Sequence, residues 1–152
     1  MKSLNLHYLF LFAVISFVLH IFWENIQAPL YTGFVSFPDH FIMCLRGALG
    51  DVVISIGALF FIILVKRTEF ARFNWTDFIA LAILGFLVAI LVEQHAIITG
   101  RWSYGSEMPI ISYLRVGLAP IVQMTFLLPF SSYLAQKLSM SLEKVDSLKT
   151  SH

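Results

Sequence analysis

Residues that can carry acid–base or metal chemistry stand at or near the ends of long apolar stretches. They are His20, Glu24, Asp51, Glu93, His95 and Arg101. Ionisable side chains cost free energy at membrane depth, and they usually face the protein interior or a water-filled cavity. We therefore interpret these residues as the walls of one polar site between apolar segments.

Two kinds of chemistry suit this set. Imidazole and carboxylate groups on neighbouring helices can hold iron, manganese or zinc, and His20 and Glu24 would be ligands. Alternatively, a carboxylic acid in an apolar site can hold its proton at neutral pH and donate it to an alkene or an epoxide. Asp51 or Glu93 would be that acid, and the other carboxylate or His95 would take the proton back.

Purely structural roles also fit the same residues. His20 and Glu24 are four residues apart, so they could form a polar pair on one face at a helix end. Asp51 could simply neutralise Arg46 or Arg101, because charges within a membrane usually pair. If the site is functional, Arg101 would instead hold a charged headgroup.

Glu93 and His95 are only two residues apart. On a helix they would point to different sides, so they serve one site only if the helix unwinds there. Trp102 and Tyr104 would be interface anchors or a substrate clamp. Gln123 would line the site or satisfy backbone groups freed by the preceding proline. The residues expected to contact a substrate are Trp23, Arg101, Trp102, Tyr104 and Gln123.

The composition is that of a membrane protein. Of the 152 residues, 59% are hydrophobic and 12% are charged, whereas soluble proteins carry about 25% charged residues. The net charge of +1 gives no reason to expect a nucleic acid partner. The single cysteine excludes an intrachain disulfide, and the chain lacks the cysteine patterns of structural zinc sites.

A membrane helix needs about 20 mostly apolar residues. The second apolar run is too short by itself, so its helix must begin near Met43 and must contain Asp51. Pro129 should kink the last helix. The four predicted spans are residues 4–23, 43–65, 76–92 (or to 98) and 116–138.

These spans predict an all-α, integral-membrane four-helix bundle. The bundle would occupy residues 1–138, and residues 139–152 would form a flexible cytoplasmic tail. Seven of the ten basic residues fall on the side of the two termini. Since basic residues concentrate in cytoplasmic segments, both termini should be cytoplasmic, in an inner (plasma) membrane. Counted from the inner boundary, Asp51 and Glu93 then lie at similar heights of roughly 21 and 26 Å.

Two features of the outer half support a ligand site. Residues 28–34 are apolar and rich in turn formers, which predicts a partly re-entrant or interfacial loop that covers the site. Gly47, Gly50 and Gly57 would allow close approach of a neighbouring helix or of a second copy in a homo-oligomer.

The run Arg101-Trp102-Ser103-Tyr104, followed by Pro120 and Gln123, resembles the lycopene-cyclase-domain membrane proteins. The likeness covers about 25 of 152 residues. That family carries a Trp-x-aromatic at an outer boundary and a Pro-x-Glu-Glu at the start of the next span. Val122 and Gln123 stand where the family has its two glutamates. The resemblance therefore implies isoprenoid-like ligands, with Glu93 or Asp51 replacing the acid pair or with cyclase activity lost.

The sequence predicts a small multi-pass membrane protein with a polar site in the outer half of the bilayer. The leading hypothesis is an enzyme that acts on a lipidic or isoprenoid substrate. The alternative is a non-enzymatic membrane subunit or a small proton-coupled carrier, in which the polar cluster is structural. Besides the bilayer, the expected partner is a lipidic small molecule.

Overall fold

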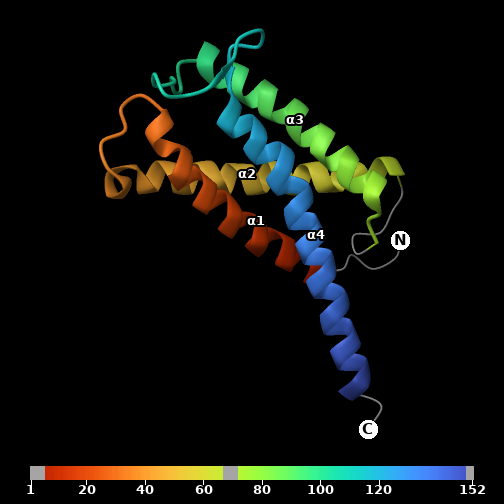
Figure 1. Ribbon diagram of the computed structural model, residues 1–152. Helices are drawn as coiled ribbons and strands as arrows, with labels where there is room; N and C mark the ends of the chain where they lie inside the picture. The colour runs from red at the N-terminus through yellow and green to blue at the C-terminus, as the bar shows by residue number, and fades with distance from the viewer. Residues whose placement is uncertain (1–5, 67–71, 150–152) are drawn as a thin grey trace.

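The computed structural model describes residues 6–66 and 72–149, and four long helices dominate it (Figure 1). All four are long and apolar enough to cross a membrane. The predicted all-α, four-helix membrane architecture is confirmed, and the chain is a small multi-pass membrane protein. The helices are α1 (Leu6–Gln27), α2 (Phe37–Lys66), α3 (Trp75–Ile98) and α4 (Leu118–Lys149).

Short elements connect these helices at one end of the bundle. The 3-10 turn η1 (Ala28–Leu30) follows α1, and the two-residue strands β1 (Ile110–Ile111) and β2 (Val116–Gly117) precede α4. The strands are antiparallel, with Ile110 opposite Gly117.

The helix boundaries extend beyond the predicted ones. α2 begins at Phe37 rather than near Met43, and α4 runs through Pro129 without interruption. Residues 139–149, which we expected to be a loosely ordered tail, are helical. This segment contains neither glycine nor proline, so nothing in it ends the helix. Residues 150–152 of the predicted tail lie outside the described residues.

α1 shows how the chain separates lipid from interior. Its exposed side repeats every four residues at Phe10, Val14, Val18 and Phe22, all large and apolar. The opposite side is buried, and it carries Tyr8, Phe12, Ser16 and His20. A four-residue spacing keeps side chains on one helix face, so the polar residues of α1 point into the bundle.

The end of the bundle away from the connecting loops is filled with apolar side chains. Tyr8, Phe12, Leu59, Leu81 and Leu128, contributed by all four helices, form its centre. α4 packs against both α1 and α3, and α1 also packs against α2. This end also buries Asp77, which pairs with Lys66 at 2.7 Å. The larger buried polar side chains His20, Gln27, Glu93 and Gln123 lie at the other end, between the helices and beneath the loops.

The two loops at that end are joined to each other. The backbone nitrogen of Thr32 donates to the carbonyl of Ser103 at 3.0 Å, and that of Gly105 donates to the carbonyl of Leu30 at 2.8 Å. Tyr31 and Tyr104 form a β-bridge between these two bonds. The loop predicted to cover the site is thus held in place by the loop between α3 and α4.

A glycine sets the approach of α3 to α4. A Cβ atom at Gly85 would lie 2.5 Å from the carbonyl oxygen of Met124, closer than real contacts permit. By contrast, a Cβ atom at Gly50 or Gly57 would meet no atom of the described residues within 4 Å. The prediction that these two glycines admit a neighbouring helix of the same chain is therefore wrong.

Gly85→Ala should push α3 away from α4. Such overpacking costs about 1–3 kcal/mol of stability, so we expect a lower thermal midpoint for the detergent-purified variant. Gly57→Ala is the matched control, because the added methyl group enters open space. Equal midpoints for the two variants would show that the close approach of α3 and α4 contributes nothing.

Candidate functional site

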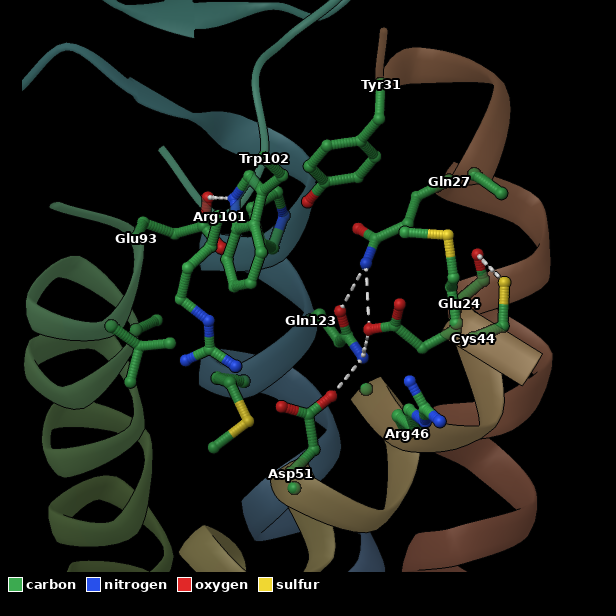
Figure 2. A pocket seen from close by; sticks show the side chains of 18 of the residues that line it. Glu24, Gln27, Tyr31, Cys44, Arg46, Asp51, Glu93, Arg101, Trp102 and Gln123 are labelled. Carbon is green, nitrogen blue, oxygen red and sulfur yellow. Dashed lines mark hydrogen bonds between the residues drawn. The ribbon is translucent and has the colours of Figure 1, made fainter. Parts of the chain in front are cut away.

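A cavity of about 800 Å³ lies beneath the joined loops. Its walls come from all four helices and from both loops, and polar side chains converge on it from opposite sides (Figure 2). The charged, amide and aromatic residues that line it include Glu24, Gln27, Tyr31, Arg46, Asp51, Glu93, Arg101, Trp102 and Gln123.

The side-chain amide of Gln123 is the centre of a buried network. Its Nε2 lies 2.8 Å from Asp51 Oδ2, 3.1 Å from Glu24 Oε1 and 3.0 Å from His20 Nδ1. Gln27 Nε2 donates to Gln123 Oε1 at 2.9 Å. An amide nitrogen carries only two hydrogens, so three acceptors share them. The position of a proton on the imidazole or on a carboxylate decides which bonds form.

His20 and Asp51 complete this network. His20 Nδ1 lies 3.1 Å from Asp51 Oδ2, and His20 is fully buried. Its other nitrogen, Nε2, has no hydrogen-bond partner among the described residues. No arginine of the described chain comes within 4 Å of Asp51, so the alternative of an Asp51–arginine pair is not what the structure shows.

Glu24 occupies space that a glycine leaves open. A Cβ atom at Gly47 on α2 would lie 3.0 Å from the Glu24 carboxylate. Glu24 also accepts a hydrogen bond from Gln27 Nε2 at 3.0 Å. Gly47 therefore matters for the carboxylate it admits rather than for the approach of a helix.

A third carboxylate, Glu93, lies on α3 across the cavity and is 4% exposed. Tyr104 donates its hydroxyl to Glu93 Oε2, and Trp102 donates Nε1 to the same oxygen at 3.3 Å. Burial and the Glu93 carboxylate raise the pKa of Tyr104, so the phenol keeps its proton and remains a donor. Tyr31 packs edge-on against Trp102, with ring centroids 6.4 Å apart.

Four residues predicted for the site do not line the cavity: His20, Trp23, His95 and Tyr104. His20 and Tyr104 reach it through hydrogen bonds to Gln123 and Glu93. His95 is exposed and does not line the cavity. The reason is that α3 stays helical to Ile98, so residues two positions apart face different sides. Trp23 does not line the cavity either. Its Nε1 donates to Gln27 Oε1 at 3.2 Å, so Trp23 contacts the Gln123 network through Gln27.

The structure adds residues that the sequence analysis did not assign to the site. Gln27 and Tyr31 line the cavity, and Arg46 joins them from α2. The spacing of Gln27 from Glu24 and Trp23 was the one local signal for its role. Arg46 had no such signal, because its direction depends on how α2 is rotated in the bundle.

The described residues do not form a metal centre. Among residues 6–66 and 72–149, no three His, Cys, Asp or Glu side chains are placed to hold a metal ion. His20 and Glu24, the predicted ligands, reach one network, in which His20 Nδ1 and Glu24 Oε1 bond to Asp51, Gln27 and Gln123 while His20 Nε2 has no partner among the described residues. This donor set does not fit the predicted iron, manganese or zinc.

Comparison of the chain with family models, with curated proteins and with solved structures finds no match. The resemblance to lycopene-cyclase-domain proteins therefore stays a prediction.

Gln123→Leu should destabilise the protein. The substitution removes the donor shared by Glu24, Asp51 and His20, and a buried polar group without a partner costs about 1–3 kcal/mol. We expect a clear drop in the thermal midpoint in detergent. Phe126→Leu, an exposed position on the same helix, is the control and should change it little. A Gln123→Leu protein as stable as the control would mean that the network contributes no stability.

Proposed function

We propose that this protein is a small integral-membrane enzyme that performs acid–base chemistry on a lipidic, isoprenoid-like substrate. The observation that carries the proposal is the sharing of one amide by two carboxylates, Glu24 and Asp51, at the wall of a large cavity. Ligand cavities of about 300–1,000 Å³ are typical of small-molecule sites. Further into the bundle the lining becomes apolar, with Ile54, Val88 and Met124.

The pair of carboxyl groups can serve as acid and base in one reaction. One carboxylic acid protonates a carbon of an alkene, and the other carboxylate removes a proton from a neighbouring carbon. One proton enters and one leaves, so an isomerisation or cyclisation balances without an oxidant or a reductant. Gln123 keeps the two groups on the same side of the substrate, and it can bond to whichever is ionised.

The resemblance noted in the sequence is compatible with this proposal. It would place two acids at positions 122 and 123, where this chain has valine and glutamine. Here two carboxylates reach Gln123 from other helices, Glu24 from α1 and Asp51 from α2. Acid groups thus lie near the expected position although they come from different parts of the chain.

The apolar packing of the inner half favours an enzyme over a carrier. The cluster around Phe12, Leu59 and Leu128 separates the cavity from the opposite end of the bundle. A carrier must expose its site to both sides in turn. A site closed on one side needs access only from the outer leaflet.

Deuterium labelling tests the proposed chemistry without a known substrate. Wild-type protein in liposomes of bacterial polar and isoprenoid lipids, incubated in D2O, should yield a lipid one mass unit heavier, because the acid delivers a solvent deuteron to carbon. Asp51→Asn and Glu24→Gln should each lower the labelling by at least about 100-fold, the usual worth of an acid–base group. The readout is mass spectrometry of the extracted lipids.

His95→Gln is the matched control, since His95 lies outside the cavity, and it should label lipids as the wild type does. Labelling that survives in both carboxylate variants would refute the acid–base mechanism. Labelling that also fails in His95→Gln would indicate a general loss of folded protein.

We also propose that both termini are cytoplasmic in the inner membrane, from the distribution of basic residues. On a Cys44→Ser background, Ser106→Cys in the loop before β1 should react with a membrane-impermeant maleimide in intact cells. Ser141→Cys near the end of α4 should react only after the membrane is permeabilised. The reverse pattern would invert the orientation and would place the cavity on the cytoplasmic side.

A further inference from the structure

Two arginines line the cavity without a carboxylate partner. Arg46 extends from α2 and Arg101 from the segment after α3, and their guanidinium groups enter the cavity from opposite sides (Figure 2). Within the part of the chain that the structure describes, neither guanidinium lies within 4 Å of a carboxylate. Both arginines are exposed where they line the cavity, so this arrangement leaves two cations available to an anion.

The carboxylates of the cavity have partners other than arginine. Glu24 accepts hydrogen bonds from Gln27 and Gln123. Glu93 accepts from a tyrosine hydroxyl and a tryptophan ring nitrogen. Asp51 is engaged by Gln123 and an imidazole. Amide, phenol, indole and imidazole groups therefore make the direct contacts to the carboxylates, and the two guanidinium groups make none.

Arg101 contacts an aromatic ring in the wall of the cavity. Its guanidinium carbon lies 5.5 Å from the centroid of the Trp102 ring, within cation–π distance. Trp102 is itself held by its bond to Glu93 and by the edge-on contact with Tyr31. A guanidinium presents planar, paired donors that match phosphate and carboxylate groups, so Arg101 beside the Trp102 ring suits recognition of such an anion.

We infer that Arg46 and Arg101 together bind the anionic headgroup, a phosphate or a carboxylate, of an amphiphilic substrate. The inference rests on the proposed function and specifies its substrate class. The apolar chain of the ligand would extend along Ile54, Val88 and Met124. A general acid acts in its protonated form. When one of the three lining carboxyl groups holds a proton, two carboxylates face two guanidinium groups, and the lining has no excess of negative charge.

Binding measured by native mass spectrometry tests the inference. The full-length protein in detergent is titrated with oleoyl glycerol phosphate and with oleate, which carry the two candidate anions on one chain. Neutral monooleoylglycerol and inorganic phosphate alone are the comparison probes. The variants are Arg46→Gln, Arg101→Gln and the double variant. Arg115→Gln, an exposed arginine outside the cavity, is the matched charge control.

At least one anionic lipid should bind more tightly than monooleoylglycerol. Each cavity variant should weaken it by about ten-fold, since charge-assisted hydrogen bonds are lost. The double variant should bind it no better than the neutral lipid, and Arg115→Gln should bind like the wild type. Equal binding of charged and neutral lipids, equal loss in Arg115→Gln, or inorganic phosphate binding as tightly as the lipid would each overturn the inference.

This experiment also separates the headgroup site from the proposed catalysis. Glu24→Gln and Asp51→Asn should still bind the anionic lipid, because they keep both arginines. Selective binding together with unchanged lipid labelling in these two variants would retain the headgroup site and reject the acid–base mechanism. Labelling that depends on the carboxylates, without selective binding, would do the opposite.

Discussion

The amide of Gln123 is the interaction on which the loop-covered end of this protein depends. It connects α4 to an imidazole and a carboxylate of α1 and to a carboxylate of α2. Buried polar groups are costly unless they are hydrogen-bonded, so three helices must keep the rotation that brings these atoms together. Burial of apolar area at the other end is not directional, and the buried Tyr8–Ser132 hydrogen bond of 2.8 Å adds one directional link between α1 and α4 there.

The joined loops meet a second requirement, which concerns the opposite wall. Their backbone bonds place Trp102 and Tyr104 over the end of α3, and both then donate to Glu93. These aromatics hold a carboxylate, whereas their spacing in the sequence predicted interface anchors or a substrate clamp. The same loops support Arg101 through the Trp102 ring. The same two loops therefore cover the cavity and position its charged groups Glu93 and Arg101.

The site was partly predictable from the sequence, and the failures have a physical cause. Asp51 and Glu93 were assigned to one depth, and both line the cavity. His95 was included through its closeness in sequence to Glu93, yet an unbroken helix directs it outward. Arg46 was considered only as a partner for Asp51, although it faces the cavity without one. Sequence distance gives position along a helix, but it does not give the direction of a side chain in the bundle.

By itself, the sequence determined the number of apolar helices, their all-α character and the positions of Asp51 and Glu93 near the same end of α2 and α3. These properties are local, since they follow from apolar run length and from the fixed rise of a helix. Only the tertiary structure decided which faces meet: Gly85 lets α3 approach α4, Gly47 admits Glu24, and Gln123 becomes the shared donor. The rotation of each helix about its axis is set by contacts with its neighbours, and no single segment contains that information.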